Sequence, residues 1–331
     1  MYLCGDNCTV EDCFFTHCYR GGIFIHGRME TVRRCNFYRC GNGMHGSGPG
    51  VAHILEDNLI VECSLRAEDD ILPLDIPGCS PEGYGPTCFK GNNLSMLFLH
   101  NIMAENEGSG WYADCPNVQG CRVIGNAFWD NPGGGIYNEA LVFDTMTQGN
   151  VFYRNGISSS VATRWNVIDN LFFESRVAWN NLDINPCRDS YMLLRGNAFV
   201  NPKYGYLADF ASGWAQTAFP EVFHNCMVDH NRIWAGKDAV LINDAGEGKN
   251  YKTLDAIRKE FKWEFHGQVQ PYEAARDTVQ AVAKAMGGSV ATFRIPWGAH
   301  HREARPMLSD AAVCGRWPGA VRSVDTGSLP S

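Results

Sequence analysis

The chain has 331 residues, of which 45% are hydrophobic and only 19% are charged, and its formal net charge is −8. Lysine and arginine do not cluster, whereas proteins that bind nucleic-acid phosphates need such clusters, so no nucleic-acid partner is expected. No apolar run reaches the roughly 18 residues of a membrane-spanning helix, and we therefore expect no membrane span.

Two stretches in the middle of the chain repeat one pattern. The first runs from Asn101 to Gly110-Trp-Tyr-Ala-Asp114, and the second runs from Asn126 to Gly135-Ile-Tyr-Asn-Glu139. Every matched position is 25 residues apart. A fixed period of this size indicates a solenoid, in which neighbouring turns cover each other's apolar faces.

Further repeat starts extend this register over residues 1–246. They are Cys13, Cys35, Asn58, Asn101, Asn126, Asn150, Asn170, Asn197 and Asn231. Each precedes a short β-branched or aromatic run, which is typical of a strand. Most intervals are 20 to 27 residues, enough for about three short strands per turn. The chain begins inside a repeat and shows no signal-peptide pattern, so we expect that it is N-terminally incomplete.

The residue types at the repeat starts have a structural explanation. Asparagine tolerates left-handed backbone geometry, and amides stacked in register can bond one another along the axis. Cysteine behaves as a small buried hydrophobe. Cys18, Cys40 and Cys63 each fall five residues after a start, so we predict buried ladders of asparagines and of thiols.

Two insertions and a C-terminal flank interrupt the repeat. Residues near 64–90 and 211–222 are rich in proline, glycine or serine, which predicts loops that project from the solenoid. Within residues 247–331, Leu254, Ile257 and Phe261 have helical spacing, with Thr253 as a candidate N-cap, and 271–286 is a second candidate helix. We predict a partly helical flank that packs on the end of the solenoid.

The pattern Gly-Asn-x-Phe, as in Gly125-Asn-Ala-Phe, Gly149-Asn-Val-Phe and Gly196-Asn-Ala-Phe, resembles the right-handed parallel β-helix repeat family, in the pectate-lyase-like superfamily. The likeness covers about residues 1–246 and implies a right-handed parallel β-helix. That superfamily includes polysaccharide lyases, glycoside hydrolases and non-catalytic surface proteins. The resemblance therefore implies a polysaccharide or oligosaccharide partner and a secreted or periplasmic location.

Polar residues recur thirteen positions after several repeat starts. They are His26, Asp114, Glu139, Thr163 and Asp183, and Gly205-Tyr-Leu-Ala-Asp209 repeats the form of Gly110-Trp-Tyr-Ala-Asp114, which adds Asp209. Stacked carboxylates repel and raise one another's pKa, so this column should be open to solvent, a cation or substrate. Acids that are merely solvated on an outward strand face are the alternative.

The column suggests a hydrolase with paired carboxylates. Adjacent strands lie about 4.8 Å apart, and carboxyl pairs roughly 5 to 5.5 Å apart suit a retaining glycosidase, whereas roughly 6.5 to 9.5 Å suits an inverting one. We predict Asp114 and Glu139 as the catalytic pair, with Asp183 as a further candidate. Trp111, Tyr112 and Tyr137 would supply faces for sugar rings, and His26 and Asp209 complete the predicted substrate site.

A lyase is the alternative enzyme. Acidic residues could hold Ca²⁺ beside a uronate while a base removes the neighbouring proton. The candidate bases are Arg164, Lys90, Arg188 and Arg195, and Arg164 is the best of them because it follows Thr163. Asp69 and Asp70 resemble the double aspartate of polygalacturonases, although the accompanying motifs are absent. His26, His45, His53 and His100 are isolated in sequence and the cysteine spacings do not resemble a zinc site, so no metal ligands are assigned. A non-catalytic, carbohydrate-binding solenoid remains the alternative outside enzymes.

Overall fold

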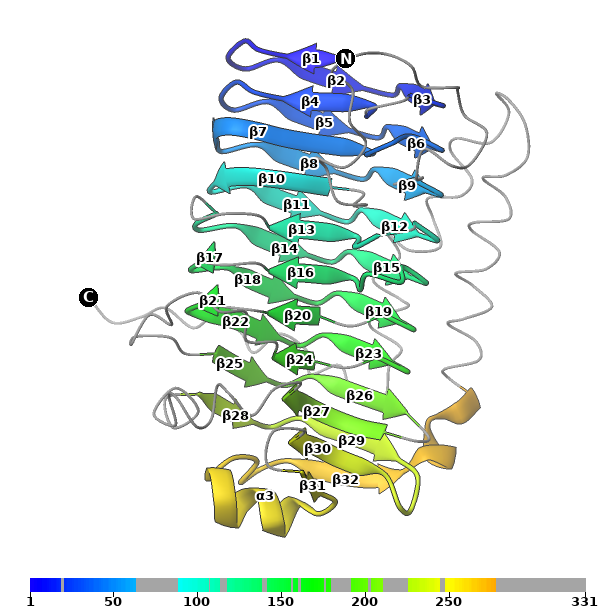
Figure 1. Ribbon diagram of the computed structural model, residues 1–331, viewed down its shortest axis with the longest axis vertical. Helices are drawn as coiled ribbons and strands as arrows, with labels where there is room; N and C mark the ends of the chain where they lie inside the picture. Colours follow the sequence, from blue (N-terminus) through cyan, green and yellow to red (C-terminus); the bar gives the residue numbers. More distant parts are fainter. Residues whose placement is uncertain are drawn as a thin grey trace, which may run out of the picture.

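The computed structural model describes residues 1–18, 21–63, 89–106, 108–113, 118–138, 142–155, 157–159, 162–175, 177–179, 192–201, 204–210, 226–244 and 248–277. In these ranges the chain winds into a stack of turns, and each turn adds a strand to three sheets that run along the stack (Figure 1). The predicted all-β solenoid is confirmed.

The first sheet has 11 strands. They are β1 (Tyr2–Leu3), β4 (Ile23–Ile25), β7 (Met44–Val51), β10 (Phe89–Leu94), β13 (Trp111–Ala113), β16 (Ile136–Asn138), β20 (Ile157–Ser159), β24 (Val177–Trp179), β27 (Tyr204–Phe210), β30 (Val240–Asp244) and β31 (Lys249–Tyr251). All pair in parallel except β31, which joins β30 in antiparallel orientation.

The second sheet has nine strands. They are β2 (Thr9–Glu11), β5 (Thr31–Arg33), β8 (Ile54–Glu56), β11 (Leu97–Leu99), β14 (Arg122–Ile124), β18 (Met146–Gln148), β22 (Trp165–Ile168), β25 (Met192–Arg195) and β28 (Met227–Asp229). In two turns an additional short strand comes before the strand of the second sheet in the chain. These two strands, β17 (Val142–Phe143) and β21 (Ala162–Thr163), pair with each other in parallel.

The third sheet has ten strands. They are β3 (Phe14–Thr16), β6 (Asn36–Tyr38), β9 (Leu59–Val61), β12 (Ile102–Ala104), β15 (Ala127–Trp129), β19 (Val151–Tyr153), β23 (Leu171–Phe173), β26 (Ala198–Asn201), β29 (Arg232–Ala235) and β32 (Gln268–Pro271). Equivalent residues of successive turns pair directly, as Met103 does with Ile60 and with Phe128.

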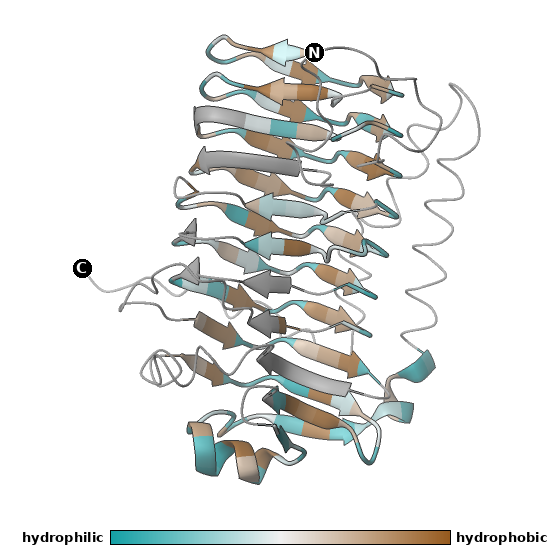
Figure 2. Ribbon diagram, in the orientation of Figure 1, coloured by the Kyte–Doolittle hydropathy of each residue, from teal (hydrophilic) through white to brown (hydrophobic). Residues whose placement is uncertain are grey.

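The interior is built from identical side chains stacked on one another. Phe128, Phe152, Phe172 and Phe199 lie in one column, with ring centroids 4.9, 4.8 and 4.8 Å apart and nearly parallel planes. All four rings are buried. Hydrophobic residues recur along the strands of successive turns (Figure 2). Since no turn can bury its own apolar face, each turn depends on the stacking of its neighbours.

The asparagines at the repeat starts form the predicted ladder. In each step the side-chain N–H of one asparagine donates to Oδ1 of the next, over distances of 2.9 to 3.1 Å, from Asn58 through Asn101, Asn126, Asn150, Asn170 and Asn197 to Asn231. All seven side chains are buried. Cys35 precedes them and its backbone N–H donates to Asn58 Oδ1.

A second ladder runs five residues further along each turn. Asn106 Nδ2 donates to Asn131 Oδ1 and Asn131 Nδ2 donates to Asn155 Oδ1, while the backbone N–H of Cys63 donates to Asn106 Oδ1. Cys40 and Cys63 are buried at this position in the earlier turns, as predicted, whereas Cys18 in the first turn is only partly buried. Both ladders therefore change from thiols to amides along the axis.

The left-handed backbone is one residue away from its predicted position. The residue before the asparagine, not the asparagine itself, has positive φ, as at Asp57, His100 and Gly125. The bend occurs at this preceding residue, so the asparagine amide is free to point inward and bond along the axis.

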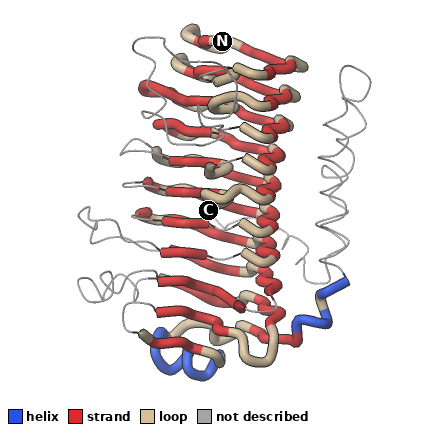
Figure 3. The backbone as a smooth tube through the Cα atoms, turned by 45° about the vertical axis from the view of Figure 1, so that its right-hand side comes forward, coloured by secondary structure: helices blue, strands red, loops and turns tan. Residues whose placement is uncertain are grey.

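The described part of the C-terminal segment covers the last turn (Figure 3). Helix α3 (Leu254–Phe261) begins where predicted, and Thr253 accepts a hydrogen bond from the Ala256 N–H as its N-cap. Ile257 and Trp263 join the solenoid core. A 3₁₀ turn, η2 (Tyr272–Ala274), follows, and the rest of the second predicted helix lies outside the described residues.

The two predicted insertions fall largely outside the described ranges, at 64–88 and 211–225. Phe89 and Lys90, predicted within the first insertion, instead begin strand β10, where Lys90 pairs with Tyr112. None of the helices in the described part of the chain is long and apolar enough to cross a membrane.

Candidate functional site

The first sheet presents a row of central residues on its outer surface. In β13, Trp111 and Ala113 are buried in the core while Tyr112 between them is only partly buried. The same alternation places Tyr137 outward in β16, between Ile136 and Asn138. Because successive side chains of a strand point to opposite faces, the central position of each strand forms the outer row.

The strand register fixes which residues share this row. In order along the axis, backbone pairing aligns Tyr2, Phe24, His45, Lys90, Tyr112, Tyr137, Ser158, Ala178, Asp209 and Asn243, of which Phe24 and His45 are buried. We call this set the outer row.

Aromatic rings in the outer row contact one another in two groups. Tyr112 and Tyr137 have ring centroids 5.0 Å apart with an interplanar angle of 32°. Tyr2 stacks on Phe24 at 4.7 Å, and Phe24 lies 5.4 Å from the His45 ring. The row therefore begins with an aromatic group and has a tyrosine pair near its middle.

The predicted contact of Trp111 with sugar is wrong. The side chain is only 1% exposed and lies in the core. Gly110-Trp-Tyr-Ala places tryptophan and tyrosine on opposite faces, so one of the two had to be internal. Trp129, another aromatic near the repeat, belongs to the third sheet and not to the outer row.

The predicted catalytic pair lies outside the described residues. Asp114 directly follows β13 and Glu139 directly follows β16 in the chain. These two strands are hydrogen-bonded neighbours, and their last residues, Ala113 and Asn138, are paired in register. Asp69, Asp70 and Asp183 also lie outside the described ranges.

The column predicted at thirteen residues after each start ends after Glu139. Ser159, not Thr163, pairs with Asn138, and Thr163 pairs with Phe143 in the separate pair β17–β21. The loop from the third to the first sheet spans 130–135 in one turn but only 154–156 in the next. Because of the shorter loop, the first-sheet strand begins closer to the repeat start in the second of these turns. The thirteenth residue after the start therefore no longer falls at the same position of the sheet.

Arg164 lies apart from the outer row. It follows β21 and precedes β22 of the second sheet, and its Nη1 is 3.5 Å from Asp144 Oδ1 on the adjacent turn. Both side chains are exposed. Its predicted place beside the acidic column is therefore wrong, for the same reason as that of Thr163, and the structure shows it as a surface ion pair.

Two other predicted residues keep a place near the outer row. His26 follows β4, is exposed, and has its ring 5.8 Å from that of Tyr2. Asp209 pairs with Ala178 and Asn243, which puts it in the row occupied by Tyr137 and not in the position after the strand, where Asp114 was matched to it. Asp209 is in register with Tyr112, and Asp114 comes two residues after Tyr112, so Asp209 lies two positions along the strand from its predicted place.

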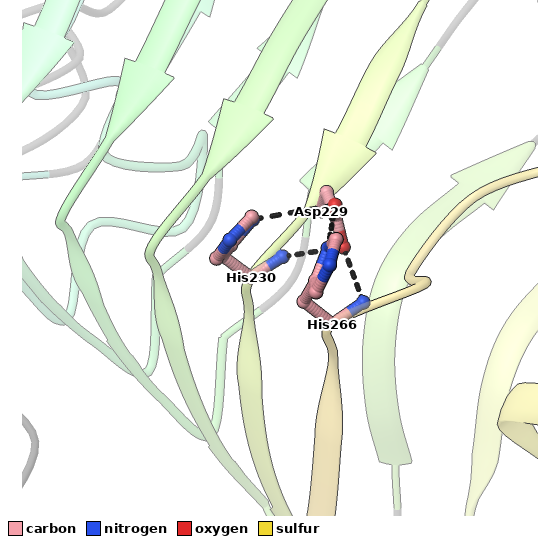
Figure 4. Close-up of side chains that lie close together, drawn as sticks. All are labelled: Asp229, His230 and His266. Carbon is pink, nitrogen blue, oxygen red and sulfur yellow. Dashed lines mark hydrogen bonds and ion pairs between the residues drawn. The ribbon is translucent and has the colours of Figure 1, made fainter.

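A cluster that the sequence did not indicate joins Asp229, His230 and His266 (Figure 4). Asp229 ends β28, His230 lies in the bend before β29, and His266 comes from the loop after α3. His266 Nδ1 is 2.7 Å and His230 Nδ1 is 3.3 Å from Asp229 Oδ2. The adjacent Asp229-His230 pair was visible in the sequence, but the 35 residues between His230 and His266 gave no sign that the chain returns.

A second pair of titratable groups is internal. Glu30 and His53 are buried on adjacent turns, with His53 Nδ1 3.9 Å from Glu30 Oε2 and accepting the Glu30 N–H at 3.3 Å. Burial raises the pKa of Glu30 and lowers the pKa of His53 to about 4. Since neither side chain reaches the surface, we assign this pair to the core and not to a binding site.

The comparisons with known proteins agree with this architecture. The family described as "Right handed beta helix region" matches residues 2–205, which is more than half of the chain. No curated protein and no solved structure matches the chain. The stacked parallel sheets and the family match together show that the chain belongs to the right-handed β-helix family.

Proposed function

We propose that the protein binds a polysaccharide along the outer row of the first sheet and hydrolyses its glycosidic bonds there. The observation that carries this proposal is the pair Tyr112 and Tyr137, whose partly buried side chains lie on the outer face of adjacent turns. Aromatic rings present an apolar face with a polar hydroxyl, a combination suited to the mixed surface of a sugar.

The spacing of the strands suits an extended glycan that runs along the solenoid axis. Adjacent strands of such a sheet lie about 4.8 Å apart, so the solenoid repeats its surface along the axis at that step. Lys90, Ser158 and Asp209 continue the outer row on both sides of the tyrosine pair. These positions give the row hydrogen-bonding residue types next to an aromatic platform.

Asp114 and Glu139 are our candidates for the chemistry. Each follows one of the two strands that carry the tyrosines, so both are adjacent in the chain to the proposed binding surface. In a retaining hydrolase one carboxylic acid protonates the leaving oxygen while the other carboxylate attacks the anomeric carbon, and water then releases the sugar. The short separation of neighbouring strands favours this retaining arrangement over an inverting one.

A lyase is the second candidate function because Lys90 shares the outer row. It pairs in register with His45 on one side and Tyr112 on the other, whereas Arg164 does not belong to the row. A lysine at this position could remove the proton beside a uronate carboxyl, with Ca²⁺ bound by Asp114 or Glu139 neutralising that carboxylate.

The test is a screen against neutral and uronate-containing polysaccharides, followed by binding isotherms on the best ligand. We expect Tyr112→Ala and Tyr137→Ala each to weaken binding about tenfold, a loss of roughly 1.4 kcal/mol. Tyr153→Ala is the matched control, since Tyr153 is a partly buried tyrosine on the third sheet, in the turn that starts at Asn150. Equal effects of all three substitutions would contradict the assignment of the surface.

The reaction is followed separately from binding. Hydrolysis yields reducing ends without the ultraviolet absorbance of an unsaturated uronate, whereas a lyase yields both and loses activity with a chelator. We expect Asp114→Asn and Glu139→Gln to abolish hydrolysis while glycan binding is kept. Binding without any product would show a non-catalytic carbohydrate-binding β-helix instead.

A further inference from the structure

We propose that Asp229, His230 and His266 form a binding site for a divalent transition-metal ion, which joins the C-terminal segment to the last turns of the solenoid. The site lies at the bend between the second and third sheets, which does not border the outer row of the first sheet. The inference is independent of the proposed function.

The carboxylate of Asp229 is oriented for this role. Its Oδ1 accepts hydrogen bonds from two backbone N–H groups, that of His230 at 2.9 Å and that of His266 at 2.7 Å. These bonds occupy one oxygen and leave Oδ2 facing the two imidazoles. Supporting bonds that fix a ligand's orientation are typical of metal sites.

The three donor atoms converge. Asp229 Oδ2 is 2.7 Å from His266 Nδ1 and 3.3 Å from His230 Nδ1, and the three donors all lie within 4.8 Å of one another. An ion bound at about 2.0 to 2.2 Å from each ligand places cis ligands roughly 3 Å apart, and the two distances from Asp229 Oδ2 are close to this separation. The rings of His230 and His266 stack at 4.5 Å, so both approach from the same side (Figure 4).

The ligand types select the class of ion. Two imidazole nitrogens and one carboxylate oxygen suit Zn²⁺, Ni²⁺, Co²⁺ or Cu²⁺, whereas Ca²⁺ and Mg²⁺ prefer oxygen ligands alone. Asp229 is partly buried while both histidines are exposed, so solvent can complete the coordination.

An ion pair without metal is the competing explanation. It requires a protonated imidazole, whereas a metal ion binds the unprotonated nitrogen. Two stacked imidazolium rings would also repel each other. Protons and a metal ion compete for the same imidazole nitrogens, so metal binding should strengthen as pH rises, whereas the ion pair should weaken.

Calorimetric titration of the full chain with ZnCl₂ at pH 7.5 tests the site. We expect His266→Gln to remove one bound equivalent or to weaken its binding at least tenfold. His100→Gln is the control, because His100 is exposed at the same type of bend, between β11 and β12. Asp229→Asn is a second variant that keeps an acceptor for the two backbone N–H groups. Comparison with wild type cancels any zinc held by cysteines.

Thermal unfolding gives a second readout. An ion that binds only the folded chain raises the midpoint, so Zn²⁺ should stabilise the wild type and His100→Gln but not His266→Gln. Identical titrations of wild type and His266→Gln would overturn the proposal, and so would affinity that is unchanged between pH 7.5 and pH 5.5. A response to Ca²⁺ as large as that to Zn²⁺ would also contradict it.

Discussion

Asn231 donates its side-chain N–H to Glu264 Oε1 at 2.6 Å, and its backbone N–H lies 3.3 Å from Glu264 Oε2. Every asparagine of the first ladder passes its donors in the same direction, so the last one has donors and no further amide to accept them. A carboxylate from the loop after α3 closes the ladder. The cap thus complements the polarity of the stack, as an anion complements a helix N-terminus.

This closure predicts a pH dependence of stability. Burial raises the pKa of Glu264 to about 7, opposed by its bonds from Asn231. The folded pKa lies above the unfolded value of 4.5, so the contribution of this group is full below pH 4.5 and is lost as pH rises to about 7. The loss is on the order of 3 kcal/mol at 1.36 kcal/mol per pKa unit. Chemical denaturation of wild type and Glu264→Gln should show it as a difference in slope.

The exposed residue Glu260, in helix α3, is the control. Glu260→Gln should follow the wild-type curve between pH 4.5 and 7. If Glu264→Gln also follows that curve, the carboxylate does not titrate with the fold.

A break in the middle of the ladder should be costly. Asn126 donates to Phe98 O at 2.9 Å and to Asn150 Oδ1 at 3.0 Å, and it accepts from the Asn101 backbone and side-chain N–H groups. Asn126→Ala leaves these buried groups without partners, at about 1 to 3 kcal/mol each. We expect a loss of roughly 3 kcal/mol or more in the free energy of unfolding, measured by denaturant titration.

Arg122→Ala, at an exposed position of the neighbouring strand β14, should change that free energy by no more than about 0.5 kcal/mol. A similar small effect for Asn126→Ala would mean that water enters the stack and replaces the amide.

Gly135 is required by the phenylalanine column. A Cβ at this position would lie 2.6 Å from Phe152 Cδ1 and 3.0 Å from Phe128 Cβ. Gly135→Ala should therefore destabilise the fold by about 1 to 3 kcal/mol, the usual cost of overpacking. Thermal melts of the single variant and of Gly135→Ala with Phe152→Leu provide the measurement. The smaller leucine should recover part of the loss, and no recovery would show that the strain lies elsewhere.

His53 should weaken the fold in acid. Burial lowers its pKa to about 4 from the ordinary 6.5, so its contribution is full above pH 6.5 and is lost as pH falls to about 4. Met96 occupies the equivalent position in the next turn. The backbone carbonyl of His53 accepts the N–H of Leu97, and the carbonyl of Met96 accepts the N–H of Arg122 in the same way. We expect His53→Met to gain up to about 3 kcal/mol relative to wild type over this interval.

Denaturant titrations at both ends of the interval measure the gain. His17→Met is the control, because His17 is exposed on the surface. A constant difference between His53→Met and wild type at pH 6.5 and pH 4 would show that the imidazole is accessible to water in the folded chain.

The repeat could be predicted from the sequence alone. Stacked turns place the same residue type at the same position, so the spacing of Asn101, Asn126 and Asn150 predicted both the period and the ladder. The short apolar runs after them became strands of the third sheet, and Thr253 with Leu254 and Ile257 gave helix α3. These features depend on local spacing and on contact between consecutive turns, which a sequence period reflects directly.

The positions on the first sheet depended on loop lengths that no period reveals. The loop from the third to the first sheet has six residues before Ile136 but only three before Ile157. Counting from the repeat start therefore placed Thr163 and Arg164 wrongly. Alternation along a three-residue strand likewise decided that Trp111 is internal and Tyr112 is external. Two contacts depend on the return of the chain after α3: that of His266 with Asp229 and that of Glu264 with Asn231. Groups so far apart in the sequence meet only when the fold brings their elements together.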